Sequence, residues 1–235
     1  MSPKILVLLT SNGPDDVEDG CPYGWYLPEL AHPYKIFKEA GVDMTFVSPR
    51  EGKTYVAPQS IEAHADDDIS VEFLNHHAET WEQTAKVADF LGKSVDFDAI
   101  FVPGGVGPMH DLVDHQPSQA LILEFSQKNK AISAVCHGQA AFLNIRADNG
   151  DPLLLNKHVT AFPESDEILM GAVNVMPFIL ETRLRDECKV RFSKADVPFG
   201  EKIVVDGNIL TGQNPASAGK LAEALVDHIS GNNTA

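Results

Sequence analysis

The chain has 235 residues, of which 43% are hydrophobic, and its formal net charge at pH 7 is -16. This length and apolar content fit a single α/β domain over 1–235 with a sizeable core, and the acidity makes nucleic acid and anionic membranes poor partners. The longest apolar runs fall well short of the roughly 20 residues of a membrane span, and a strand pattern begins directly after Pro3. We therefore expect neither a transmembrane helix nor a signal peptide.

The cysteine count favours a reducing compartment. Three cysteines are too few, and an odd number, for a disulfide framework. We expect the protein in the cytoplasm, with the nucleus as an alternative, and we interpret the Asn232-Asn233-Thr234 glycosylation sequon as a chance occurrence.

The first 48 residues predict a βαβ unit. Lys4–Thr10 is a continuous apolar run typical of a buried parallel strand, and Ser11–Gly24 is a polar loop. Trp25–Ala40 has helical spacing, with an expected kink at Pro33. A second short strand follows over Met44–Val47, which completes the unit.

Residues 49–96 interrupt this alternation. The segment contains the run Asp66-Asp67-Asp68, which we interpret as a solvated loop, and an amphipathic stretch over Phe73–Val87, but no convincing strand. We expect a cap that packs over one end of the sheet, in the position of a lid.

The second half of the chain resumes the sheet. Strands are predicted at Ala99–Val102, Ala131–Val135 and Val159–Phe162, and Asp206-Gly207 predicts a hairpin between Lys202–Asp206 and Ile209–Thr211. Helices are predicted at Pro117–Asn129, at Pro177–Asp186 and from the Asn214-Pro215 start signal to Ile229.

Cys136 lies where a predicted strand becomes a predicted helix. Ala134 and Gly138 give the small-x-nucleophile-x-glycine spacing of a nucleophile elbow. A thiol there stands at the carboxyl edge of the sheet and at a helix N-terminus, which favours the thiolate. The alternative is an ordinary buried cysteine.

Two further features could assist such a thiol. Gly104-Gly105 ends a neighbouring strand, where it serves either as a plain turn or as an oxyanion hole made of backbone N–H groups. Glu29 is either a solvated acid or, if it turns inward among its apolar neighbours, a hydrogen-bonded or protonated carboxyl that can shuttle a proton.

His137 directly follows the cysteine. Adjacent side chains on a sharp turn point apart, so a direct Cys–His pair does not follow from the spacing, and a third group must orient the imidazole. Glu164, Asp166 and Glu167 are the candidates, and spacing alone does not choose among them or exclude a solvated acidic loop.

The remaining candidates have weaker support. We interpret the other histidines as surface residues or pocket neighbours and the other cysteines as loop or structural thiols: His76, His77 (with Glu79 or Glu82), His110, His115, Cys21 and Cys188. Adjacent histidines on one helix diverge, so we predict no metal site. Neither a Walker motif nor G-x-G-x-x-G follows the first strand, so nucleotide binding has no support.

Several segments together resemble a known superfamily. They occur in the order found in the ThiJ/PfpI superfamily and are spread over nearly the whole length of the chain: KILVLLTS, GWYLPELAHPYKIFKEAG, VPGGVGPMHDL, AVCHGQAA, VTAFPESDEILMG and VVDGNILTGQNPASA. The chain looks most like the heat-shock-protein-thirty-one-like branch, the glutathione-independent glyoxalases (glyoxalase III). The resemblance implies a flavodoxin-like three-layer α/β sandwich, mostly parallel, with helices on both faces and a small cap.

The resemblance also implies roles for individual residues. Cys136 becomes the nucleophile, Glu29 the carboxyl bonded to it, His137 a triad member and Glu167 the triad acid, while Gly105 and the His137 backbone form the oxyanion hole beside Gly104. It implies a lyase of the D-lactate dehydratase type that forms a homodimer. We expect no cofactor, and the metal-binding histidine arrangement of some bacterial relatives has no clear counterpart in this chain. This lyase would convert methylglyoxal and glyoxal to D-lactate and glycolate in stress-related dicarbonyl detoxification.

Other functions remain open at this point. A stress-inducible chaperone, a redox sensor using Cys136 or a protein deglycase, an activity that is disputed, would each be compatible with the same fold. A cysteine amidase or peptidase uses the same elbow, but neither His158 nor His228 is followed by the His-x-Glu pattern of a glutaminase.

Overall fold

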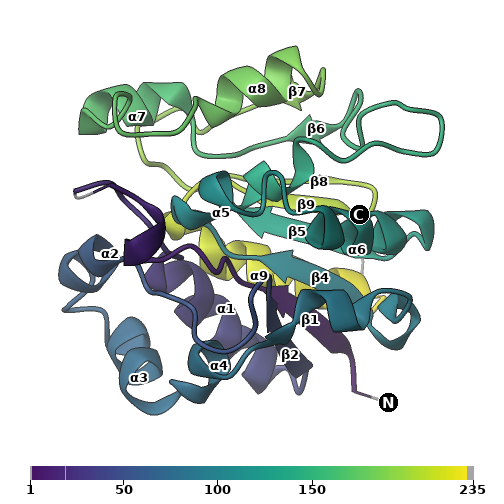
Figure 1. The fold of residues 1–235 in the computed structure, drawn as a ribbon, viewed down its shortest axis with the longest axis horizontal. Helices are drawn as coiled ribbons and strands as arrows, with labels where there is room; N and C mark the ends of the chain where they lie inside the picture. Colours follow the sequence, from purple (N-terminus) through teal and green to yellow (C-terminus); the bar gives the residue numbers. More distant parts are fainter. Residues whose placement is uncertain (1, 19, 232–235) are drawn as a thin grey trace.

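The computed structural model describes residues 2–18 and 20–231, so the sequon at 232–234 lies outside the described part. A seven-stranded sheet has the order β3-β2-β1-β4-β5-β9-β8, and every neighbouring pair is parallel except β8 with β9 (Figure 1). Its strands are β1 (Lys4–Leu8), β2 (Asp43–Ser48), β3 (Ala85–Lys86), β4 (Ala99–Val102), β5 (Ala131–Val135), β8 (Ile203–Asp206) and β9 (Ile209–Gly212). The predicted mostly parallel α/β fold is confirmed.

Helices cover both faces of this sheet (Figure 1). The α-helices are α1 (Leu27–Glu39), α2 (Pro58–Ala63), α3 (Asp68–His76), α4 (Glu79–Glu82), α5 (Gly107–His110), α6 (Gln116–Gln127), α7 (Glu164–Met170), α8 (Leu180–Asp186) and α9 (Ala218–Ile229). The 3-10 turns are η1 (Pro14–Asp16), η2 (Val87–Phe90), η3 (Ser94–Asp96), η4 (Gly138–Phe142) and η5 (Pro215–Ser217).

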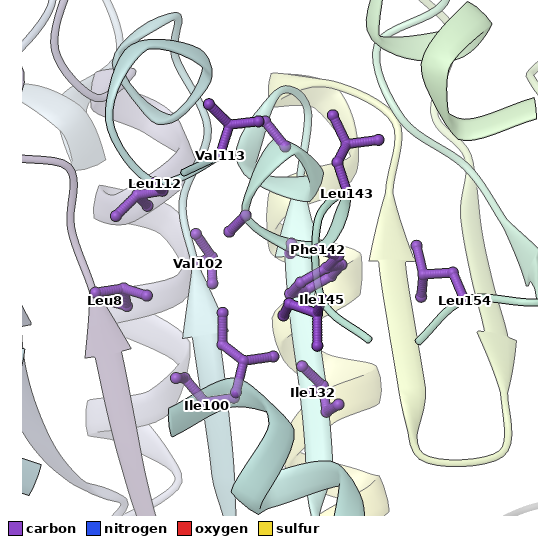
Figure 2. Close-up of a cluster of buried hydrophobic side chains, with 14 of the residues drawn as sticks. Leu8, Ile100, Val102, Leu112, Val113, Ile132, Phe142, Leu143, Ile145 and Leu154 are labelled. Carbon is purple, nitrogen blue, oxygen red and sulfur yellow. The ribbon is translucent and has the colours of Figure 1, made fainter. Parts of the chain in front are cut away.

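Alternate residues of the central strands enter two separate cores. Leu8, Ile100, Val102 and Ile132 point to the face that α6 and η4 cover, and Phe142 from η4 packs among them (Figure 2). The intervening residues, such as Val7 and Phe101, face α1 and α9. Because a strand sends successive side chains to opposite faces, a continuous apolar run is needed where both faces are buried.

The C-terminal elements follow the predictions closely. β8 and β9 form the expected antiparallel hairpin, with Asp206 paired to Ile209 across the Gly207 turn. Asn214 caps η5 through its side-chain oxygen, which accepts the Ser217 N–H at 3.2 Å, and α9 follows to Ile229.

Some predicted boundaries were wrong. α1 begins at Leu27 and continues through Pro33, α8 begins only at Leu180, and the residues after Cys136 form η4 rather than an α-helix. The strand expected at Val159–Phe162 is only His158–Val159 (β6), which pairs with Arg191–Phe192 (β7) outside the main sheet.

Part of the segment 49–96 belongs to the main sheet. The prediction that it holds no strand was wrong, since β3 pairs with β2 and extends the sheet edge. α3 buries Phe73 against Trp25, with ring centroids 6.4 Å apart. Asp67 is not part of a purely solvated loop, because it caps α3 and bonds His32 at 2.7 Å.

The strand order reverses direction at β1 and β4. From β1 the chain continues outward to β2 on one side, whereas β4 leads to β5 on the other side. Open parallel sheets bind ligands in the crevice at the carboxyl ends of strands where this reversal occurs. Glu29 follows β1, Gly104 follows β4 and Cys136 follows β5, so the topology gathers these residues at one edge. Within residues 2–18 and 20–231, we find no helix long and apolar enough to cross a bilayer.

Candidate active site

Cys136 occupies a strained turn at the end of β5. Its φ is +60°, a left-handed conformation that costs a non-glycine residue energy and marks functional turns. The turn is held because the Cys136 N–H donates to the Gly212 carbonyl at 3.0 Å and its carbonyl accepts the Phe162 N–H at 3.2 Å. A Cβ at Gly138 would lie 2.5 Å from the Val102 carbonyl oxygen, so the elbow requires glycine there.

The structure brings Cys136, His137 and Glu167 into one chain of contacts. The Cys136 Sγ lies 3.3 Å from His137 Nδ1, and His137 Nε2 lies 2.6 Å from Glu167 Oε1. A carboxylate partner favours the proton on Nε2, which leaves Nδ1 free to accept the thiol proton. The expectation that the two adjacent side chains point apart was wrong, because Sγ and Nδ1 lie within contact distance and both residues line one pocket.

The three acidic candidates have separate positions. Glu167 is buried and contacts the imidazole, whereas Glu164 is exposed at the start of α7. Asp166 is also buried, but its Oδ2 accepts the backbone N–H of Phe199 at 3.0 Å. Only Glu167 of the three is therefore placed to orient His137, whose ring also stacks on Phe162 at 4.9 Å.

Glu29 is fully buried, with 0% of its surface exposed. Neither carboxyl oxygen makes a hydrogen bond of standard geometry, although the Cys136 thiol and the Gly104 N–H face the group. Burial raises the pKa of Glu29 to about 8, against smaller lowering effects of Cys136 and Gly104. Glu29 is thus mainly a protonated acid at neutral pH, the second of the two states expected for an inward-facing carboxyl.

The pKa of Cys136 is raised well above its usual value. Burial is the largest cause and the charge of Glu29 the next, while the Gly105 N–H facing the sulfur lowers it. The prediction that a helix N-terminus would favour the thiolate was wrong, because η4 is a short 3-10 turn and the thiol is 4% exposed. A base must therefore remove the thiol proton, and His137 is the adjacent one.

Gly104 and Gly105 are required by close packing around the thiol. A Cβ at Gly104 would lie 2.5 Å from Glu29 Oε2 and 2.7 Å from the Cys136 Cβ. Gly105 has a φ of +90°, and a Cβ there would lie 2.5 Å from the Gly24 carbonyl oxygen. The pair is a tight turn and, because the Gly105 N–H faces the sulfur, also a donor at the reacting atom.

Sequence reasoning missed Gln139. Its side-chain nitrogen donates to the carbonyls of Ala134, Thr160 and Gly212, at 3.1, 2.9 and 2.9 Å, which ties β5, β9 and the segment before Phe162 together. An amide directly after an elbow gives no sequence signal of this role, since the partners come from segments far apart in the chain.

A pocket of about 980 Å³ opens onto the thiol. Its lining includes the residues expected at the site, Cys136, His137, Glu29 and Gly105. It also includes two residues that were not predicted from the sequence, Tyr26 before α1 and His64 after α2. Burial, followed by the charges of Glu29 and Cys136, raises the pKa of Tyr26 to about 12. Tyr26 therefore stays a hydroxyl donor at any physiological pH.

Of the other cysteines and histidines considered as candidates, Cys21 lies at the pocket, whereas Cys188, His115 and His77 have partners elsewhere. Cys21 lines the pocket, Cys188 is buried against the Leu143 carbonyl, and His115 caps α6. His77 lies 3.3 Å from Glu72 and 3.6 Å from Glu79 rather than at the thiol. In the described ranges, no three histidine, cysteine or acidic side chains gather in a metal-binding cluster.

This arrangement can activate a sulfur nucleophile and move protons beside it. His137 can accept the thiol proton and hold it with Glu167, and Glu29 can exchange a proton near neutral pH because its pKa is about 8. Such chemistry fits addition of a thiol to a carbonyl followed by proton transfer at the neighbouring carbon.

The chain is similar to known proteins over most of its length. The model of the DJ-1/PfpI family matches residues 4–228. The glutathione-independent glyoxalase hsp3102 of Schizosaccharomyces pombe is 32% identical over 88% of this chain and 90% of its own length, and glyoxalase 3 of Candida albicans is 27% identical over 95% and 97%. The crystal structure of glyoxalase III from Candida albicans superposes with a TM-score of 0.79, at 26% identity over 95% of this chain and 96% of that one.

Proposed function

Since the chain belongs to the DJ-1/PfpI family, we propose that it is a glutathione-independent glyoxalase that converts methylglyoxal to D-lactate and glyoxal to glycolate. Relatives named as glutathione-independent glyoxalases support this activity over nearly the whole chain. The observation that carries the proposal is the contact chain Cys136–His137–Glu167 with a protonated Glu29 beside the sulfur. The enzyme would then be a lyase of the D-lactate dehydratase type.

The first step is addition of the thiol to the aldehyde. As the Cys136 Sγ attacks the aldehyde carbon of methylglyoxal, His137 Nδ1 takes the thiol proton, 3.3 Å away, and Glu167 stabilises the resulting imidazolium. The carbonyl oxygen then takes a proton from the protonated Glu29 or from the His137 imidazolium and becomes a hydroxyl, so the product is a hemithioacetal. The Gly105 N–H, which faces the sulfur, would stabilise the negative charge that develops on this oxygen, together with the backbone N–H of His137.

The second step moves a proton between the two substrate carbons. The group that gave its proton to the oxygen, Glu29 as its carboxylate or His137 as its neutral imidazole, removes the proton from the carbon that bears sulfur. This gives an enediol, and the same group returns the proton to the neighbouring carbon. The hemithioacetal thereby becomes a thioester of the 2-hydroxy acid. The Glu29 pKa of about 8 suits a group that must both give and take a proton near neutrality.

The last step is hydrolysis of the thioester. Water adds to the acyl carbon, the carbon–sulfur bond breaks and the thiol regains its proton, so the net change adds one water to one methylglyoxal. No external thiol takes part, because Cys136 supplies the sulfur that glutathione provides in other glyoxalases.

The direct test is conversion of methylglyoxal without glutathione. We expect the purified protein to consume the dicarbonyl and to release D-lactate, and we expect Cys136→Ala to release none while its circular dichroism spectrum stays unchanged. Full activity of Cys136→Ala would contradict the proposal.

A second candidate function rests on an exposed apolar surface at the end of α7. Ile168, Leu169 and Met170 at the end of α7 are 61%, 61% and 62% exposed, which is unusual for three consecutive large apolar residues. A stress-inducible chaperone needs such a surface. Suppression of aggregation of a heated client protein, lost in Ile168→Ser/Leu169→Ser and retained in Cys136→Ala, would support this function independently of catalysis.

Location and assembly belong to the same proposal. The resemblance supports a homodimer, and the three free cysteines support the reducing cytoplasm, with the nucleus as an alternative. Light scattering coupled to size-exclusion chromatography would detect the dimer, and a monomer at micromolar concentration would contradict it.

A further inference from the structure

An apolar wall extends from the reacting atoms to the surface. The His137 ring stacks on Phe162 with centroids 4.9 Å apart, and Phe162 lies 6.5 Å from the Phe199 ring. Phe162 and Phe199 both line the pocket, together with Met170, Val175 and Met176. These five apolar side chains between positions 162 and 199 therefore line the pocket, and Tyr26 and His64 add polar groups to its lining.

Phe199 has a backbone conformation and an exposure that are both unfavourable for an aromatic residue. Its φ is +55°, a conformation that bulky residues avoid, and its side chain is 44% exposed although it is an aromatic ring. The backbone N–H is fixed at 3.0 Å on Asp166 Oδ2, and Asp166 is itself only 2% exposed. A strained, exposed ring fixed by a buried carboxylate points to a function at that position.

Asp166 and Glu167, neighbours in the first turn of α7, position two different parts of the pocket. Glu167 orients the His137 ring, and the neighbouring Asp166 anchors the backbone of Phe199. The position of the apolar wall and the position of the base are therefore fixed by one short helix, α7 (Glu164–Met170), relative to the sulfur.

The pocket is large for the substrate of the proposed function. Pockets of roughly 300–1,000 Å³ bury whole drug-sized ligands, and this one measures about 980 Å³. Methylglyoxal has only a few non-hydrogen atoms and a single methyl group, so most of the apolar wall stays unused when its aldehyde carbon lies at the Cys136 sulfur.

We propose that Phe162, Phe199 and the adjoining methionines form a subsite for a large apolar substituent, so that the enzyme prefers aryl or long-chain 2-oxoaldehydes to methylglyoxal. This inference rests on the proposed function and narrows its substrate class. With phenylglyoxal, the sulfur adds to the aldehyde carbon, the proton moves to the carbon bearing the ring, and hydrolysis releases mandelate. The balance is one phenylglyoxal plus one water, as with methylglyoxal.

The test compares the two aldehydes in matched variants. We expect kcat/KM for phenylglyoxal to exceed that for methylglyoxal by about tenfold or more in the wild type, which is within the range that apolar pocket contacts provide. Phe199→Asn removes the ring but tolerates the left-handed backbone, so we expect it to cut this ratio about fivefold to tenfold, through KM, without lowering the melting temperature. Val197→Ala, on the same exposed loop but outside the pocket lining, is the control and should leave the ratio unchanged.

A binding measurement separates this inference from the proposed function. In the Cys136→Ala background, calorimetry should give a Kd for mandelate about tenfold below that for lactate, and Phe199→Asn should remove the difference. Equal Kd values, or an unchanged kcat/KM ratio in Phe199→Asn, would overturn the subsite. If mandelate binds more tightly as expected but the wild type converts neither aldehyde, the subsite stands and the glyoxalase function fails.

Discussion

The buried carboxyl of Glu29 makes the stability of the fold depend on pH in an unusual direction. Most carboxyls gain stability from ionisation in the native state, but burial raises the pKa of this one from 4.5 to about 8. Between these values the native state holds a proton that the unfolded chain has lost, so stability falls as the pH rises. The perturbation that removes this effect is Glu29→Gln, which keeps the shape and cannot titrate.

The size of the change in stability follows from the difference between the pKa of Glu29 in the folded and in the unfolded chain. The contribution is fully present below pH 4.5 and is lost progressively up to the folded pKa of about 8. One pH unit corresponds to about 1.4 kcal/mol, so the free energy of unfolding falls by up to about 5 kcal/mol across this window. Cys136 does not cancel the effect, because its own pKa is raised and the thiol stays protonated throughout.

Urea denaturation at pH 5, 6, 7 and 8 measures this difference. The free energy of unfolding of the wild type, minus that of Glu29→Gln, should decrease by about 1.4 kcal/mol per pH unit between pH 5 and pH 8. The amide hydrogen-bonds differently from the carboxyl, which can add the same amount to the difference at every pH and leaves the predicted slope unchanged. A difference that stays the same at all four pH values would refute the prediction and would mean that Glu29 ionises normally.

Three further substitutions test the surroundings of the thiol. Gly104→Ala places a Cβ 2.5 Å from Glu29 Oε2, and it should lower the free energy of unfolding by about 1–3 kcal/mol and remove most of the activity. Gly219→Ala is the control, because its nearest new contact is at 3.7 Å, and thermal melts and activity assays should find its stability and activity unchanged. Glu167→Gln should lower kcat about 10²-fold or more with little change in melting temperature, because His137 loses the carboxylate that orients it, and a kcat within threefold of wild type would refute this. Gln139→Leu should cost about 1–3 kcal/mol in urea denaturation, since three carbonyls lose their donor, and an unchanged midpoint would show that those bonds contribute nothing.

The parts of the fold that local pattern determines were predictable from sequence. The apolar runs of β1, β4 and β5, the Asp206-Gly207 hairpin and the Asn214 cap are set by residues close together in the chain. β3 and the β6–β7 pair have only two residues per strand, so their existence depends on tertiary neighbours and leaves no periodic signal.

The sequence indicates which residues belong to the site, but it does not indicate how their side chains are arranged. Residue types and the family resemblance indicated Cys136, Glu29 and Glu167, yet the direction of His137 depends on the +60° φ of the preceding residue, which no spacing rule gives. The protonation of Glu29 and the raised pKa of Cys136 follow from complete burial, which sequence does not display for a charged residue. The anchored Phe199 was not predicted, because its partner Asp166 lies on a different segment.

The central claim is that the Cys136 sulfur carries the substrate. Rapid acid quenching of the enzyme during turnover of methylglyoxal, followed by peptide mass spectrometry, tests it most directly. We expect a substrate-derived adduct on the peptide containing Cys136 and none on the peptides containing Cys21 or Cys188. Steady turnover with the adduct absent from Cys136, or present equally on Cys21, would contradict it.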